Sequence, residues 1–241
     1  IIIIIIYNLY LYTYLNQPRI EVKNIFFLNC LEDSACLKAA FQKAAPIFMA
    51  GMPEIGVEVQ DVMDMEDISF DLAGLQFTLK DGKLKGLKTV VFDEVKWDQK
   101  KKQIDIDFYL DATVKGHYTA GGRILILPIT GDGQMKLKLK HIQIKFHVHY
   151  EMEKDAEGKD HVVPKKYTYE FDVKDNANFH LSNLFNGNTE LSETMLKFLN
   201  ENWKQISVEF GKPMVDVAAK SLFRNMVNFL VNQPIGDIAN V

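Results

Sequence analysis

The sequence predicts an α+β fold: one elongated domain in which a strongly curved antiparallel β-sheet wraps a long C-terminal helix. Three observations lead to this prediction. Apolar and polar residues alternate over about fifteen residues from Ile104 to Tyr118, turn signals divide the flanking segments into further strands, and apolar residues keep helical spacing between Leu191 and Val231. Alternation of this length describes a strand of roughly 50 Å, when strands usually stop near five or six residues.

The bulk composition is that of a globular protein with a substantial core. The 241 residues include 47% hydrophobic and 25% charged side chains, and the net charge is −4. The largest basic cluster is Lys100–Lys102, whereas phosphate backbones bind to wider basic faces. Nucleic acid is therefore not an expected partner.

The N-terminal run IIIIIIYNLYLYTYL, residues 1–15, is apolar but interrupted by Tyr and Asn. No basic segment precedes it, and it is shorter than the ~20 apolar residues that span a bilayer. We interpret residues 1–22 as a leader remnant or a disordered terminus, and we expect no stable membrane insertion. Residues 23–241 then form the folded domain.

A helix is predicted just after the only two cysteines, Cys30 and Cys36. Asp33 or Ser34 can cap this helix, and its apolar residues at helical spacing are Leu37, Ala40, Phe41, Ala44 and Phe48. The short spacing of the cysteines favours a disulfide and an oxidising compartment, while two free thiols in a cytosolic protein are the alternative. The residues expected to end the helix are Pro46, Gly51 and Pro53.

Strand segments separated by turn signals follow, as in an antiparallel meander. The expected strands are Leu75–Leu79, Val91–Trp97, Ile104–Tyr118, Ile124–Ile129 and Tyr167–Val173. The expected turns or breaks are Asp81–Gly82, the Lys-rich segment before Ile104, Gly121–Gly122, Gly131–Gly133 and Asp155–Asp160. Between Lys136 and Tyr150 the apolar positions change from odd to even numbers, which predicts a β-bulge near Lys140 or His141 and a curling strand.

The C-terminal helix is expected to cover about forty residues with a bend at Gly211 and Pro213. From Met214 onward its apolar residues spread round most of the circumference, which is typical of an enclosed helix. An elongated body buries less surface than a compact one, so we hypothesise that the interior holds an extended apolar guest. Ordinary dense packing is the alternative.

No catalytic residue, metal site or cofactor motif is predicted. His147 and His149 share a strand face, but no Cys or acidic partner near them in the sequence completes a set of three or four ligands. Asp105, Asp107 and Asp111 lie on the polar face of the long strand, where solvation explains them better than acid–base catalysis. We therefore expect a protein that is not an enzyme.

Large apolar side chains on the predicted inward faces are the candidates for lining a cavity. They are Phe41, Phe48, Met49, Phe77, Phe108, Leu110, Tyr118, Ile144, Phe146, Met195, Phe198, Trp203, Phe223 and Met226.

Four features together resemble the insect takeout and juvenile hormone binding protein family. They are the cysteine pair before an Ala-rich helix, GHYTAGGRILILPITGDGQMKLKLK from Gly116, NLFNGN from Asn183 and LSETMLKFLNENWK in the terminal helix. The resemblance covers residues 29–241 and implies an α/β-wrap fold of the tubular lipid-binding class. It also implies a Cys30–Cys36 disulfide. Juvenile hormone binders carry a second disulfide that this chain lacks, which favours the takeout branch.

The resemblance implies a secreted, monomeric carrier. It would bind an extended hydrophobic small molecule, such as a terpenoid, a fatty-acid-like or a quinone-like compound, in an internal tunnel, with at most transient contact to a membrane or receptor. An extracellular signalling or interaction module with a filled core is the alternative reading.

Overall fold

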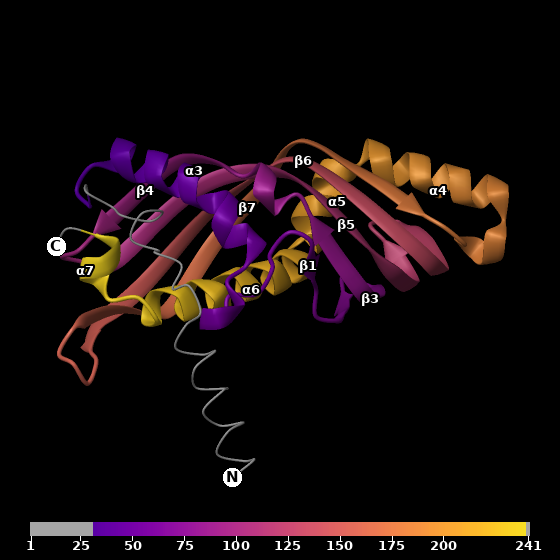
Figure 1. The fold of residues 1–241 in the computed structure, drawn as a ribbon. Helices are drawn as coiled ribbons and strands as arrows, with labels where there is room; N and C mark the ends of the chain where they lie inside the picture. Colours follow the sequence, from indigo (N-terminus) through magenta and orange to yellow (C-terminus); the bar gives the residue numbers. More distant parts are fainter. Residues whose placement is uncertain (1–30, 240–241) are drawn as a thin grey trace, which may run out of the picture.

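The computed structural model describes residues 31–239, which form an elongated body (Figure 1). The helices are α3 (Ser34–Ala50), α4 (Thr189–Glu201), α5 (Trp203–Phe210), α6 (Lys212–Val231) and α7 (Ile235–Ile238), with short 3-10 turns at Pro53–Ile55, Leu87–Thr89 and Phe185–Gly187. The strands are β1 (Met63–Asp64), β2 (Ile68–Leu72), β3 (Leu75–Lys85), β4 (Val91–Asp98), β5 (Gln103–Ile124), β6 (Leu127–Lys154) and β7 (Asp160–Leu181).

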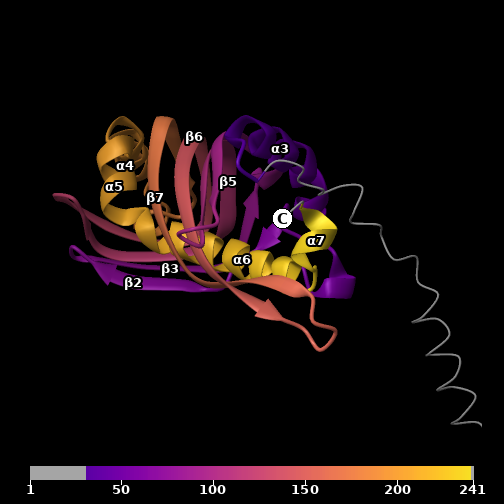
Figure 2. The ribbon, with the colours of Figure 1, turned by 90° about the vertical axis from the view of Figure 1, so that its left-hand side faces the viewer.

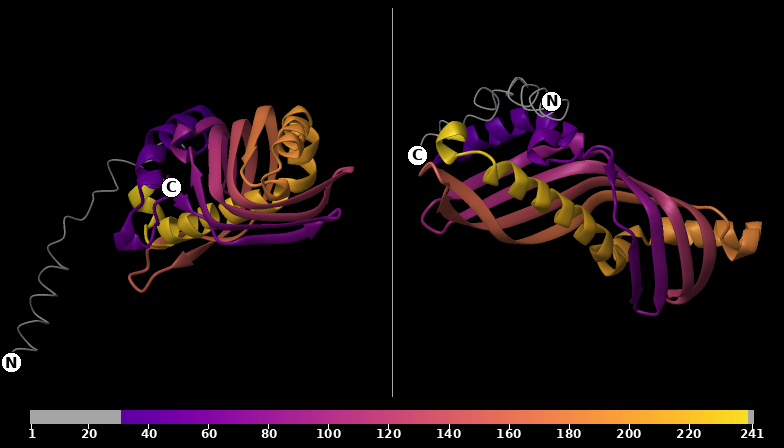
Figure 3. Two further views of the ribbon diagram at one scale, coloured as in Figure 1. Left: turned by 90° about the vertical axis from the view of Figure 1, so that its right-hand side faces the viewer. Right: turned by 60° about the horizontal axis from the view of Figure 1, so that its bottom comes forward.

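The strands form one open antiparallel sheet around the C-terminal helices, which confirms the predicted fold class. The main order is β1-β3-β5-β6-β7, with β2 paired to β3 and β4 paired to β5. One edge of β5 is shared, because β4 pairs with its first half and β3 with its second half. Figures 2 and 3 show the sheet curving around α6, which lies lengthwise across the concave face.

The central strand β5 is longer than its alternation predicts. From Gly116 to Ile124 it pairs with β6 in an unbroken register. The predicted break at Gly121–Gly122 and the predicted turn at Gly131–Gly133 are therefore both wrong. Gly122 and Gly131 allow close approach instead: a Cβ on Gly122 would lie 2.2 Å from the Gly74 carbonyl oxygen, and one on Gly131 would lie 2.5 Å from the Tyr118 hydroxyl. The chain reverses at residues 125–126.

The predicted bulge near His141 is confirmed. The β6–β7 register shifts between Lys140 and Ile142, and the β5–β6 register shifts opposite it, between Leu110 and Ala112. The extra residue His141 has a φ of 49°, and its N–H donates to the Asp111 carboxylate at 2.8 Å. Paired bulges on neighbouring strands bend the sheet at this point.

Two of the other predicted turns are confirmed and one is wrong. The Lys-rich segment joins β4 to β5, and residues 155–159 join β6 to β7. At Asp81–Gly82, by contrast, β3 continues to Lys85, and the register with β5 shifts between Lys80 and Lys83. Asp81 has a φ of 51°, so the turn signal marks a bulge within one strand.

Helix α3 begins at the predicted cap, because the Asp33 carboxylate accepts from the N–H groups of Ala35 at 2.9 Å and Cys36 at 3.2 Å. Pro46 does not end the helix, which continues to Ala50 and is capped by Gly51. Buried residues on both sides of Pro46 hold the helix against β4, and this packing outweighs the one backbone hydrogen bond that proline removes. Cys30 lies outside the described residues, so the Cys30–Cys36 disulfide stays a prediction.

The C-terminal helix is divided into α4, α5 and α6, with interruptions at Asn202 and Gly211. The bend at Gly211 and Pro213 is as predicted, and the earlier interruption is not. A Cβ on Gly211 would clash with the Ser207 carbonyl and lie 3.1 Å from the Phe171 ring, so only glycine allows this approach of the helix to β7. None of the helices in residues 31–239 is long and apolar enough to cross a bilayer.

Candidate functional site: two adjoining apolar cavities

The first cavity lies between α5, α6 and the middle of the curved sheet, and it is the larger of the two only when the open mouths are counted. Its walls enclose about 1330 Å³ of space, open mouth included. Strands β2, β3, β5, β6 and β7 supply the outer wall, because every second residue of each strand points to the concave side. The helices supply Leu199, Ile206, Ser207, Phe210, Gly211, Met214, Val215, Ala218, Ala219 and Leu222.

The second cavity lies between α3, β4, the first half of β5 and the end of α6, and encloses about 1130 Å³, open mouth included. Aromatic rings are prominent in its wall. They are Phe41, Phe48, Phe92, Trp97, Phe108, Phe146 and Phe229. Several pack edge to face, such as Phe41 on Phe92 at 5.7 Å between ring centres.

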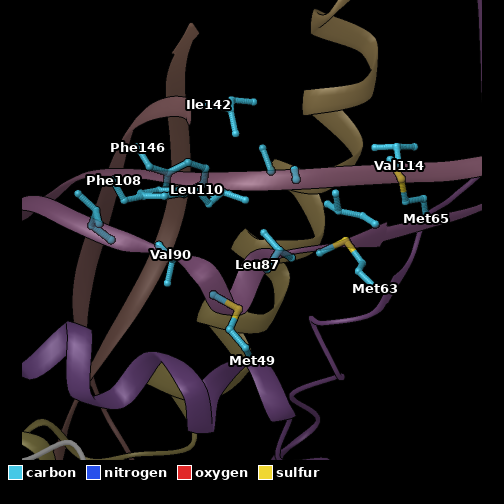
Figure 4. Packing of buried hydrophobic residues seen from close by; sticks show 14 of the residues in the cluster. Met49, Met63, Met65, Leu87, Val90, Phe108, Leu110, Val114, Ile142 and Phe146 are labelled. Atoms are coloured by element: carbon cyan, nitrogen blue, oxygen red, sulfur yellow. The ribbon is translucent and has the colours of Figure 1, made fainter. Parts of the chain in front are cut away.

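The two cavities share part of their walls. The shared side chains are Leu87, Phe108, Leu110, Phe146 and Leu222. Figure 4 shows Phe108 and Leu110 of β5 close to Phe146 of β6, with Leu87 on the 3-10 turn between β3 and β4. We call these five residues the neck, because they lie where one cavity adjoins the other.

The lining is almost free of polar groups. Apart from Ser207, every residue that lines either cavity is glycine or has an apolar side chain, with Trp97 classed as apolar because of its large ring. The indole N–H of Trp97 already donates to the Tyr150 hydroxyl at 2.9 Å. Binding here would therefore come from burial of apolar surface, with little directional recognition.

Helix α6 is fixed from the side that faces away from the cavities. Asn225 is fully buried; its side-chain oxygen accepts from the N–H of Glu58 at 2.7 Å, and its amide donates to the Ser221 carbonyl at 2.8 Å. The Ser221 hydroxyl donates to Gln60 at 3.5 Å. The bonds to Glu58 and Gln60 tie α6 to the segment between α3 and β2, in addition to its apolar packing.

Ion pairs extend the same contact at the surface. Arg224 lies 2.7 Å from Glu58, and Lys220 lies 2.7 Å from Glu66. The hydrogen bond and charge of Lys220 lower the pKa of the Glu66 carboxyl below its usual value. These groups are about half exposed, so each pair adds little stability.

On the β7 side, α6 is held by a Tyr–Asp–Lys cluster. The Tyr169 hydroxyl and the Lys212 ammonium both donate to the Asp216 carboxylate. Burial by itself would raise the pKa of Asp216, but the two hydrogen bonds outweigh it and lower that pKa. Burial and the Asp216 contact raise the pKa of Tyr169, which keeps its hydroxyl a donor.

Nine of the fourteen predicted lining residues line a cavity. They are Phe41, Phe48, Met49, Phe77, Phe108, Leu110, Ile144, Phe146 and Met226. The other five, Tyr118, Met195, Phe198, Trp203 and Phe223, line neither cavity.

Contacts with protein account for several of these five. Tyr118 is fully buried and donates to the Ser182 carbonyl at 2.8 Å, and burial raises the pKa of its hydroxyl to about 12. Met195 is buried in α4. Phe223 packs on Tyr167 at 4.6 Å between ring centres.

The sequence prediction missed several lining residues. Phe171 and Phe210 belong to periodic patterns that identify the inner faces of β7 and α5, so they were within reach of the same reasoning. Phe92 and Phe229 line the same cavity because both pack on α3, Phe92 on Phe41 and Phe229 on Phe48. No local pattern carries that information.

The described residues hold no group of three or more His, Cys, Asp or Glu side chains placed to bind a metal ion. His147 has one acidic partner from another strand, since its Nδ1 lies 2.6 Å from the Asp105 carboxylate. This pair joins β6 to β5 on the convex face, away from both cavities.

Comparison with known proteins supports the resemblance seen in the sequence. The model of the family "Haemolymph juvenile hormone binding protein (JHBP)" matches residues 11–239. The crystal structure of Epiphyas postvittana Takeout 1 superposes with a TM-score of 0.88 at 69% sequence identity, covering 90% of this chain and 100% of that chain.

The circadian clock-controlled protein daywake of Drosophila yakuba and that of Drosophila melanogaster are 28% and 27% identical to this chain over 212 residues. The alignments cover 83% of this chain and 81% of each relative. Because the family model spans nearly all of the sequence and the fold matches a solved takeout protein, the predicted family is confirmed. The chain belongs to the haemolymph juvenile hormone binding protein family, which includes the takeout proteins.

Proposed function

We propose that this protein is a secreted, monomeric carrier that encloses one extended hydrophobic molecule in a tunnel formed by the two cavities. The observation that carries the proposal is the pair of apolar cavities with a common neck. Family membership supports it, because the family model is named for binding juvenile hormone. Residues 23–241 are the ligand-binding domain in this proposal.

The composition of the walls supports loose selectivity. Affinity would come from apolar burial at roughly 25 cal/mol per Å², and the lining has few groups that could distinguish a terpenoid from a fatty-acid-like or quinone-like chain. Such a wall has nothing to activate a bond, so we propose transport without turnover. Contact with a membrane or receptor would be transient, at loading or release.

Two matched variants test the tunnel. Phe108 belongs to the neck and lines both cavities, whereas Phe223 lines neither and packs on Tyr167. We expect delipidated wild-type protein to bind a long-chain fluorescent fatty-acyl probe with saturable one-to-one stoichiometry. Phe108→Trp should weaken this binding at least roughly tenfold by narrowing the neck, and Phe223→Trp should change it less than about twofold.

An interaction module with a filled core predicts a different result. In that case the delipidated protein would not bind the probe, or both tryptophan variants would behave alike. Circular dichroism and thermal melting of the two variants would show whether either substitution acts by unfolding the protein.

A further inference from the structure

Ser207 is the one side chain lining the first cavity that can form a hydrogen bond. It lies on α5, one turn before the bend at Gly211, and is only 8% exposed. No hydrogen bond of its hydroxyl is found within residues 31–239, although this oxygen is not among the fully enclosed unpaired atoms. A hydroxyl offers one donor and two acceptor sites, and leaving them unmatched in an apolar space costs free energy.

The neighbouring backbone groups at the bend are already paired. The Ser207 carbonyl accepts from the N–H of Gly211 at 3.0 Å, and the N–H groups of Met214 and Val215 both donate to the Gly211 carbonyl at 3.1 and 3.2 Å. The start of α6 therefore does not offer these two amides to a ligand. The Ser207 hydroxyl is left as the group that an oxygen atom of a ligand would meet.

The charge of the lining restricts what that oxygen can be. No Lys, Arg or His side chain is among the residues that line either cavity. An ionised carboxylate held there would be buried without a counter-charge, which is strongly unfavourable. A neutral carbonyl or hydroxyl carries no such penalty and matches a single donor and acceptor.

We propose that the first cavity binds the oxygen-bearing end of a neutral lipophile, a ketone, ester, aldehyde or alcohol, with the Ser207 hydroxyl as its hydrogen-bond partner. This inference rests on the proposed carrier function and narrows its ligand class. The same site disfavours ionised fatty acids. Ser207 is a specificity-determining residue in this account, and the rest of the wall supplies affinity.

The test compares three ligands of equal chain length as competitors of a fluorescent probe: 2-tridecanone, n-tridecane and tridecanoate, at about pH 8 where the acid is ionised. Ser207→Ala should lower the affinity for the ketone roughly three- to tenfold and leave the affinity for the alkane unchanged. Tridecanoate should bind wild-type protein more weakly than the ketone and should not respond to the substitution.

Ser221→Ala is the matched control, because Ser221 is also 8% exposed but lines neither cavity and is bonded to Gln60. It should leave the ketone-to-alkane ratio unchanged. The inference is overturned if Ser207→Ala affects ketone and alkane equally or affects neither, or if tridecanoate competes as well as the ketone. Wild-type protein that binds neither ketone nor alkane would instead overturn the carrier function itself.

Discussion

The two faces of α6 differ in chemistry and in how completely they are packed. Toward the sheet the helix presents Met214, Ala218 and Leu222 to open space. On the other side Asn225 accepts a hydrogen bond from the N–H of Glu58, and Ser221 donates one to Gln60, both in the segment after α3. Protein interiors are normally packed without large voids. Polar bonds on one face therefore help to fix the helix, so that the other face can be left unfilled.

Disrupting the polar face of α6 should destabilise the protein most. Asn225→Ala removes two hydrogen bonds and leaves the N–H of Glu58 without its acceptor. We expect the free energy of unfolding to fall by about 2–4 kcal/mol, as measured by urea denaturation. Asn232→Ala is the control: Asn232 is exposed, follows the last residue of α6, and donates to the carbonyls of Ile55 at 3.4 Å and Asn228 at 2.8 Å. Its substitution should cost less than about 0.5 kcal/mol. Equal losses for the two variants would contradict the contrast between the faces.

Filling the cavity-facing side of α6 should weaken ligand binding and leave the free energy of unfolding nearly unchanged. Ala218→Phe places a ring in the first cavity, so we expect probe affinity to fall more than about tenfold while the free energy of unfolding stays within about 1 kcal/mol of wild type. Fluorescence titration and urea denaturation measure the two quantities. Val231→Phe, at a position on α6 that is 40% exposed, should change neither. Undiminished binding by the Ala218 variant would show that ligand lies elsewhere.

The smallest effect concerns the β7 side of the helix and depends on pH. The pKa of Asp216 is lowered in the folded protein, so its contribution to stability is present above roughly pH 4 and is lost as the pH falls through the lowered value. Because its side chain is 47% exposed, we expect the contribution to stay below about 1 kcal/mol. Asp216→Asn should flatten the acid side of the stability profile between roughly pH 2 and 5. If the stability of Asp216→Asn depended on pH as steeply as that of the wild type, or more steeply, this contribution of Asp216 would be contradicted.

The sequence predicts those parts of the architecture that depend on the local spacing of apolar residues. The alternation from Ile104 and the change of phase at His141 identify the long strand and its bulge, because side-chain direction in a strand follows the backbone. The glycine signals at Gly122 and Gly131 are misread, since glycine serves both turns and close approach. Only the partner strand decides between these two uses.

The cavity is less predictable than the fold for a related reason. Phe108 and Phe223 both lie on inward faces by periodicity, yet one meets open space and the other meets Tyr167. Which inward residue faces a void depends on how far α3 and α6 stand from the sheet. That spacing is set by distant contacts such as Asn225 with Glu58, which no local pattern reveals.

The most direct test is a crystal structure of the delipidated protein reloaded with a bromine-tagged octadecyl alcohol. If the two cavities form one tunnel, we expect an anomalous bromine signal inside one cavity and continuous chain density through the neck between Phe108, Phe146 and Leu222. Bromine found only on the outer surface, with side chains closing the neck and filling the space on either side, would contradict it.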